Sequence, residues 1–246
     1  IIGNSKTIDG KNSARIFVIN SNQVTLNGIT FQNAETKSTS DHDTNGAAIY
    51  VIGSNANILN CNFNNNIANE DGGAIFIEGD DCTLNHTTFT GNIAHNDGGA
   101  IEWRGDNGKI YDLNATGNYA DSAQGSIVGD TTKGSSKGGT ILVAGDNILL
   151  DKLNISNSKV SGETYTGTKP IQGGAIAVSG SNNNITNSVF TNCSVLYEGD
   201  NCSGGALYIW GNHSYIYNVW WWSIGCCNGC RFNSLDSSSK SFKVRS

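Results

Sequence analysis

The sequence predicts an all-β fold, a single-stranded parallel β-helix (solenoid) of about seven coils, and three observations support this prediction. A tetrapeptide of the Gly-Gly-Ala-Ile type recurs along the chain. An aliphatic residue follows ten positions after its third residue in every copy, and a large or apolar residue follows five positions later. The last residue of each tetrapeptide and the residue two positions later are both apolar, and this period of two is typical of a strand. The copies are Gly46-Ala-Ala-Ile49, Gly72-Gly-Ala-Ile75, Gly98-Gly-Ala-Ile101, Gly138-Gly-Thr-Ile141, Gly173-Gly-Ala-Ile176 and Gly204-Gly-Ala-Leu207.

The first predicted strand of each coil directly follows the glycines. Its inward residues are the pairs Ile49/Val51, Ile75/Ile77, Ile101/Trp103, Ile141/Val143, Ile176/Val178 and Leu207/Ile209. Helical repeats are disfavoured because the chain is rich in Gly, Asn, Ser and Thr, which are poor helix formers. Stacked coils therefore bury these residues as continuous columns.

A corner, a second strand, a bend and a short strand complete each predicted coil. The corner is marked by a second glycine ladder, Gly53, Gly79, Gly105, Gly145, Gly180 and Gly211, where we expect unusual backbone angles. The second strand carries Ile58, Leu84, Ile110, Leu150, Ile185 and Ile216, and the short one carries Phe63, Phe89, Ala115, Ile155, Phe190 and Trp221. Leu26 and Phe31 belong to an incomplete earlier copy.

The spacing between the short strand and the next glycine pair varies, whereas the other offsets are constant. All insertions therefore enter at one corner of the predicted helix. Insertions gathered on one edge of a solenoid commonly build its binding surface. The alternative is that surface loops simply tolerate lengthening, because closure entropy grows slowly with loop length.

The repeat resembles known surface proteins. Its Gly-Gly-Ala-Ile motif alternates with Phe-x-x-Asn, as in Phe63-Asn-Asn-Asn66 and Phe89-Thr-Gly-Asn92, which is similar to the polymorphic outer-membrane proteins of chlamydiae. The opening Thr7-Ile-Asp-Gly10, with Val24-Thr-Leu26 and Ile29-Thr-Phe31, resembles the adhesin-like surface proteins of methanogenic archaea. The resemblance implies a right-handed helix, secretion and a role in attachment at the cell surface, although repeats mark architecture better than they mark a ligand.

Composition restricts the partners. A net charge of −6 with 15% charged residues argues against nucleic acid, and no segment of the sequence resembles a membrane span. The sequence predicts one β-helix domain over residues 1–222, followed by a C-terminal cap or tail over residues 223–246. The chain begins at Ile1 without Met, which suggests a processed protein or a piece of a longer one.

The end of the repeat and the cysteines leave alternatives open. The tryptophans near residue 222 and the Ser/Lys-rich tail either cap the open coil or form a face for an end-to-end homo-oligomer. The second alternative would make the chain a self-assembling subunit of a surface filament or sheath. Cys61 and Cys82 fall in different columns and are expected to be buried thiols, whereas Cys193 and Cys202 flank an insertion and can staple it. The Cys226-Cys-Asn-Gly-Cys230 segment has the spacing of a metal knuckle but no second pair of ligands.

The sequence favours binding over catalysis. The column between the inward residues of the first strand is predicted to face outward, where aromatic rings can stack on sugars or receive a protein, unless the corner loops cover them. The predicted ligand-binding residues are Tyr50, Phe76, Glu102, Tyr208 and Trp210. The expected partner is a glycan or protein of a host or neighbouring cell, and no cofactor is expected.

A carbohydrate-active β-helix enzyme (polysaccharide lyase, hydrolase or epimerase) is the alternative, and a convergent cluster of three or more acids would favour it. Its best candidates are Glu78 and Glu102, with Arg104 stacked above Glu78 as a surface ion pair. Asp71 and Asp97 are weak candidates for a cation site. The sequence identifies no catalytic residue.

Overall fold

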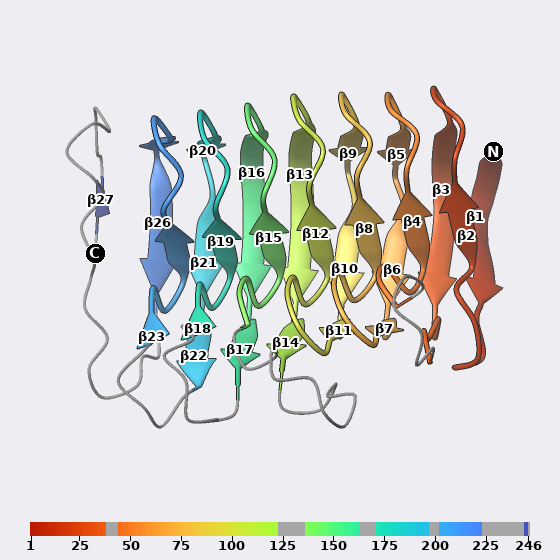
Figure 1. The fold of residues 1–246 in the computed structure, drawn as a ribbon, viewed down its shortest axis with the longest axis horizontal. Helices are drawn as coiled ribbons and strands as arrows, with labels where there is room; N and C mark the ends of the chain where they lie inside the picture. Colours follow the sequence, from red (N-terminus) through yellow and green to blue (C-terminus); the bar gives the residue numbers. More distant parts are fainter. Residues whose placement is uncertain (38–43, 123–135, 163–170, 197–201, 223–243, 246) are drawn as a thin grey trace.

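The computed structural model describes residues 1–37, 44–122, 136–162, 171–196, 202–222 and 244–245 and confirms the parallel β-helix. Every strand pairing in this described part of the chain is parallel. The coils stack along one axis, with the N-terminus at one end and the C-terminus at the other (Figure 1). Segments one repeat apart in sequence therefore lie side by side.

The strands that follow the glycine pairs form a seven-stranded sheet, which we call the Gly-Ile sheet. Its strands are β2 (Phe17–Ile19), β4 (Ile49–Val51), β8 (Ile75–Ile77), β12 (Ile101–Trp103), β15 (Ile141–Val143), β19 (Ile176–Val178) and β24 (Leu207–Ile209). The predicted register is confirmed: Ile75 pairs with Ile49 and Ile101, and Ile77 pairs with Val51 and Trp103.

The second predicted strand and the short strand after it join a thirteen-stranded sheet, which we call the long sheet. Its strands are β1 (Ile2–Asp9), β3 (Thr25–Gln32), β5 (Asn57–Leu59), β6 (Asn62–Asn64), β9 (Thr83–Asn85), β10 (Thr88–Thr90), β13 (Lys109–Thr116), β16 (Leu149–Ser156), β20 (Asn184–Thr186), β21 (Val189–Thr191), β25 (Tyr215–Tyr217), β26 (Val219–Trp222) and β27 (Val244–Arg245). The repeat did not predict β1, which pairs with β3 through a register shift between Ile2 and Lys6.

A third sheet precedes the corner that receives the insertions. Its strands are β7 (Ile67–Ala68), β11 (Ile93–Ala94), β14 (Tyr119–Asp121), β17 (Lys159–Ser161) and β22 (Ser194–Leu196), and β18 (Ile171–Gln172) pairs with β23 (Cys202–Ser203) nearby. The insertions after β14, β17 and β22 begin after a strand of this sheet, and the one after β3 begins beyond Glu35, which forms a bridge with Ile67 of β7; all four end before the next glycines of the repeat. The prediction of insertions at one corner is thereby confirmed.

The Phe-x-x-Asn motif has two structural roles. Phe63 stacks on Phe31 and on Phe89 inside the helix, with ring centroids 5.1 and 4.7 Å apart. Asn92 is fully buried; its Nδ2 donates to the carbonyl oxygen of Phe63 at 3.0 Å, and its Oδ1 accepts from Nδ2 of Asn66 at 2.9 Å. The ladder satisfies polar groups that burial would otherwise leave unpaired.

Left-handed backbone angles recur in columns, and they explain the abundance of Asn and Gly. One column runs through Asn55, Asp81, Asn107, Asn147, Asn182 and His213, and another runs through Asn60, His86, Asp112, Lys152, Asn187 and Asn218. The Gly53 ladder lies at a corner with left-handed angles, as predicted, but these angles fall two residues later, on Asn55 and its equivalents, and none of the ladder glycines has a positive φ. Gly79 is required there because a Cβ would overlap the carbonyl oxygen of Gly53.

The described cysteines Cys61, Cys82 and Cys193 are buried free thiols. The prediction for Cys61 and Cys82 is confirmed, whereas the proposed staple between Cys193 and Cys202 is not formed. The sulfur of Cys193 instead contacts the carbonyl oxygens of Thr191 and Ile155, at 3.5 and 3.7 Å. The segment 226–230 lies outside the described residues, as does most of the predicted cap, which stays a prediction.

The described part of the chain contains no helix long and apolar enough to cross a membrane.

Candidate functional site

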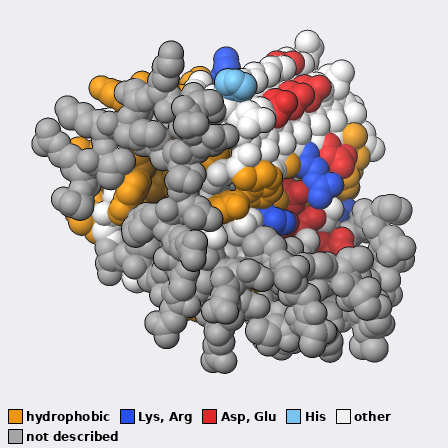
Figure 2. Space-filling model, turned by 60° about the vertical axis from the view of Figure 1, so that its left-hand side comes forward, with side chains coloured by type: hydrophobic (Ala, Val, Ile, Leu, Met, Phe, Trp, Pro, Cys, Tyr) orange, Lys and Arg blue, Asp and Glu red, His pale blue; other side chains and the backbone are white. Residues whose placement is uncertain are grey.

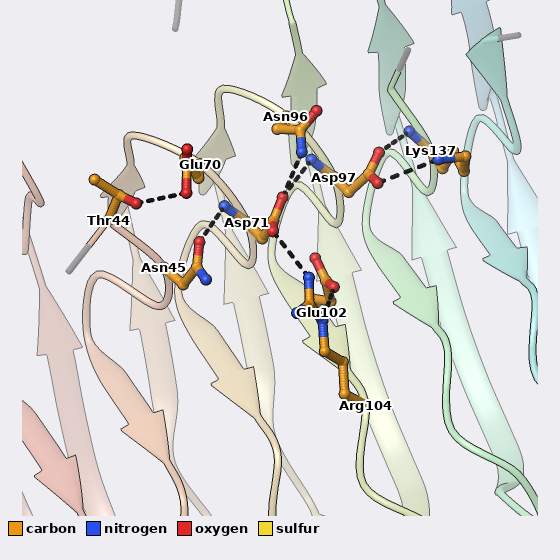
Figure 3. Close-up of polar contacts among 9 residues, drawn as sticks. All are labelled: Thr44, Asn45, Glu70, Asp71, Asn96, Asp97, Glu102, Arg104 and Lys137. Carbon is orange, nitrogen blue, oxygen red and sulfur yellow. Dashed lines mark hydrogen bonds and ion pairs between the residues drawn. The ribbon is translucent and has the colours of Figure 1, made fainter. Parts of the chain in front are cut away.

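The residues that precede the glycine pairs form a ladder at the insertion corner (Figure 3). The backbone amide of Asp71 donates to Oδ1 of Asn45 at 3.1 Å, and that of Asp97 donates to Oδ1 of Asp71 at 3.2 Å. The amide of Lys137 continues the series to Oδ1 of Asp97 at 2.7 Å. Each carboxylate or amide side chain therefore fixes the backbone of the next coil.

Glu102 and Arg104 on and beside β12 complete the site. Nε of Arg104 donates to Oε1 of Glu102 at 2.6 Å, and its terminal nitrogen lies 3.3 Å from Oδ2 of Asp71. Nζ of Lys137 lies 3.4 Å from Oδ2 of Asp97. We call Asp71, Asp97, Glu102, Arg104 and Lys137 the corner cluster; it brings three acids and two bases together from neighbouring coils (Figure 3).

Burial perturbs the three acids of the cluster. Loss of hydration raises the pKa of Glu102 well above its usual range, and the negative charges of Asp71 and Asp97 raise it further. Burial likewise raises the pKa of Asp71, and it raises the pKa of Asp97 to about 7 against the attraction of Lys137. The cluster therefore contains a carboxyl group that changes charge near neutral pH.

One oxygen of the cluster has no hydrogen-bond partner. The side chain of Glu102 is only 3% exposed, and its Oε2 atom is buried and unpaired. A buried carboxylate oxygen without a donor is unfavourable unless the group is protonated or meets a ligand.

The predicted cation position at Asp71 and Asp97 is filled by the chain's own cations. Asn96 donates to Oδ1 of Asp71 at 2.8 Å, while Arg104 and Lys137 lie against the remaining oxygens. Within the described residues, no group of three or more His, Cys, Asp or Glu side chains is arranged to hold a metal ion.

The predicted outward aromatic column is largely covered, which corrects the expected exposed strip. Phe76 is fully buried, and the guanidinium of Arg104 lies 4.7 Å from its ring centroid. Arg15 lies 5.4 Å from the ring centroid of Tyr50. Burial and a hydrogen bond to Glu78 raise the pKa of Tyr50 to about 12. Internal cation–π contacts thus use ring faces that were expected to meet a ligand.

Tyr208 and Trp210 remain accessible at the C-terminal end of the same sheet. Trp210 is 44% exposed and Tyr208 is half-buried, with their ring centroids 5.4 Å apart. Nζ of Lys137 lies 6.0 Å from the centroid of Trp210, which connects this pair to the corner cluster. Figure 2 shows acidic, basic and hydrophobic side chains gathered side by side on one face of the molecule.

The predicted ion pair between Glu78 and Arg104 is not formed. The 26-residue register holds, since Ile77 pairs with Trp103, but the guanidinium turns toward Glu102 and Asp71. Sequence reasoning also missed Lys137 and Asn45 as members of the ladder. Their position immediately before a Gly, which they share with Asp71 and Asp97, was the available signal.

Comparison with known proteins locates one family signature in this region. Residues 60–78 and 86–102 match the Chlamydia polymorphic membrane protein repeat. No curated protein and no solved structure matches the chain significantly. The matched segments include Asp71, Asp97 and Glu102, and they span two successive passages through the long sheet and the insertion corner. This part of the chain therefore carries a repeat similar to that of the Chlamydia polymorphic membrane proteins, as its motifs predicted.

Proposed function

We propose that the chain is an extracellular, adhesin-like β-helix module that is displayed at a cell surface and attaches to a glycan or protein without catalysis. The observation that carries this proposal is the match to a polymorphic membrane protein repeat over residues 60–78 and 86–102. Such a repeat supplies a rigid rod, and the insertions at one corner supply variable surface. Both features suit a protein that presents binding surface away from a cell.

The candidate contact residues for this function are Tyr208 and Trp210, because their rings are accessible. Tyr50, Phe76 and Glu102 lie on earlier strands of the same sheet, where they contact Arg15 and Arg104. Two aromatic rings beside Lys137 form a surface with both apolar and cationic character.

Attachment is tested with beads coated with the purified chain and applied to glycan-coated and protein-coated surfaces. The expected result is specific retention, weakened in the Tyr208→Ala/Trp210→Ala variant and unchanged in Val18→Ala, an exposed apolar control. Antibody labelling of intact source cells is expected to be positive. Failure of the beads to attach to any surface, together with labelling only after lysis, would contradict the proposal.

A second candidate function is favoured by the corner cluster, because three acids converge there and one of them titrates near pH 7. In a glycoside hydrolase, a protonated carboxyl donates its proton to the leaving oxygen while a carboxylate activates water. Asp97 and Glu102 are the residues with the pKa values for such roles. We rank this function second because Arg104 and Lys137 already engage the acids and all three are largely buried.

Catalysis is tested by incubating polysaccharides with the wild-type chain and with Glu102→Gln, and measuring new reducing ends and unsaturated products. Turnover that disappears in Glu102→Gln, while this variant keeps its melting temperature, would support the enzyme. Absence of products from neutral, acidic and amino polysaccharides would eliminate it.

A further inference from the structure

The last coil carries a row of aromatic side chains on the outer face of the long sheet. Inward residues of β25 and β26 continue the core columns, since Ile216 pairs with Ile185 and Trp221 pairs with Phe190. Alternation along the strands then directs four rings outward. They belong to Tyr215, Tyr217, Trp220 and Trp222, which we call the aromatic row.

The row consists of two pairs of aromatic rings with equal geometry. The ring centroids of Tyr215 and Tyr217 are 6.3 Å apart with planes inclined by 14°, and Trp220 and Trp222 repeat the same values. Tyr215, Tyr217 and Trp222 are 37%, 44% and 51% exposed. The ring planes within each pair are therefore nearly parallel, and their spacing is that of alternate residues on a β-strand, which the backbone imposes.

Hydrogen bonds fix the centre of the row. Asn218, at the left-handed bend between the two pairs, donates from Nδ2 to Oδ1 of Asn187 on the preceding coil at 2.8 Å. Its own Oδ1 accepts from the indole nitrogen of Trp220 at 3.2 Å. An orientation fixed before binding reduces the entropy lost when a ligand is bound.

The preceding coil places mostly polar, uncharged side chains beside the row, and on the other side Arg245 of β27 pairs with Trp220. The corresponding positions of the preceding coil hold Asn184, Thr186, Val189 and Thr191, which pair in register with Tyr215, Tyr217, Trp220 and Trp222. Amide and hydroxyl groups beside flat aromatic faces match a ligand with both hydroxyl groups and apolar C–H faces. On this side of the row no side chain is charged, which favours a neutral ligand over an acidic or basic one.

We propose that the aromatic row is a binding platform for an extended neutral polysaccharide that lies along β25 and β26. Sugar rings stack on Tyr215, Tyr217, Trp220 and Trp222, and sugar hydroxyls bond to the flanking Asn and Thr side chains. The inference rests on the proposed attachment function and names its ligand class. A second copy of the chain is disfavoured because the row lies on the outer face of the sheet, whereas end-to-end stacking needs the edge of β26, where β27 pairs with Val219 and Trp220.

Affinity electrophoresis of the full chain in gels containing cellulose derivatives, xyloglucan, β-glucan, mannan or galactan tests the platform. Retardation by at least one neutral polysaccharide is expected, with binding about tenfold weaker in Tyr217→Ala and in Trp222→Ala. Ile52→Ala is the matched control, since Ile52 is exposed to the same 44% as Tyr217 but lies on another coil. Thermal melting checks that each variant folds.

Retardation that survives in both row variants, or no retardation in any gel, would overturn the platform. Retention of coated beads on protein-coated surfaces alone, lost in the row variants, would likewise overturn it and identify a protein-binding surface. Loss of bead attachment in the Tyr208→Ala/Trp210→Ala variant but not in the row variants would retain the attachment function and reject the platform.

Discussion

Oδ1 of Asp71 accepts a hydrogen bond from the backbone amide of Asp97, one coil further along the chain, at 3.2 Å. This contact joins two acids whose charges would otherwise repel, and it occurs at the corner where every long insertion enters. It requires Arg104 and Lys137 to balance the buried charge. The stability of the stacked coils is consequently expected to depend on the pH through the corner cluster.

The first prediction concerns Asp97. Its folded-state pKa of about 7 exceeds the ordinary value of 3.8, so the folded chain retains a proton that the unfolded chain releases. Stability from this group is present at low pH and is lost as the pH rises from about 4 to about 7. The unfolding free energy of the wild type should fall relative to Asp97→Asn by up to about 1.4 kcal/mol per pH unit. Urea unfolding of both proteins between pH 4 and pH 7 checks this prediction. The same pH dependence of the unfolding free energy in both proteins would contradict it.

The second prediction concerns Arg104. Arg104→Ala leaves Glu102 and Asp71 buried without their cation and should cost about 2 kcal/mol at pH 8, because the half-exposed guanidinium is partly screened. The cost should shrink at pH 5, where the acids take up protons. Lys152→Ala removes an exposed partner of Asp112 and should cost at most about 1 kcal/mol. Equal losses in both variants at both pH values would reject this account.

The third prediction concerns the buried asparagine ladder. Asn92→Ala removes bonds to Phe63 and Asn118 and leaves Asn66 without its acceptor, so it should lower the unfolding free energy by about 3 kcal/mol. Thr90→Ala, on the exposed side of β10, should change it by less than about 0.5 kcal/mol. Chemical denaturation of both variants measures the difference, and a similar small loss in each would show that the ladder contributes little.

The fourth prediction separates two kinds of glycine. Gly79→Ala forces a Cβ into the carbonyl oxygen of Gly53 and should cost more than about 2 kcal/mol, since backbone must move. Gly117 has a φ of +66° and open space around its Cβ position, in a column where Asn157 and Asn192 adopt similar angles. Gly117→Asn should therefore leave stability unchanged within about 0.5 kcal/mol. Comparable melting temperatures for the two variants would contradict the distinction.

The core columns could be predicted from the sequence because each coil repeats the same local choices. Ile75 and Phe89 lie at fixed distances from Gly72, so the register of one coil sets the register of the next. A slip of one residue would turn the apolar set outward, which makes the register robust. Strand β1 was missed because it lacks the repeat and is mostly exposed.

The candidate site was predicted only in part. Asp71, Asp97 and Glu102 were identified as acids near one edge, but their convergence was not, and Arg104 was assigned to Glu78. A long side chain has several partners within reach, and the pattern of the repeat does not choose among them. Exposure of Phe76 was also misjudged, because period two gives the face of a strand and not what covers that face.

The sequence by itself determined the solenoid, the columns of its core and the corner that receives insertions, since these follow from apolar residues at constant offsets. Only the tertiary structure decided which charges meet. Lys137 reaches Asp97 across 40 residues, and Arg104 reaches Asp71 across 33. Such contacts form when stacking brings neighbouring coils within hydrogen-bond distance, and their strength depends on the burial that the completed fold creates.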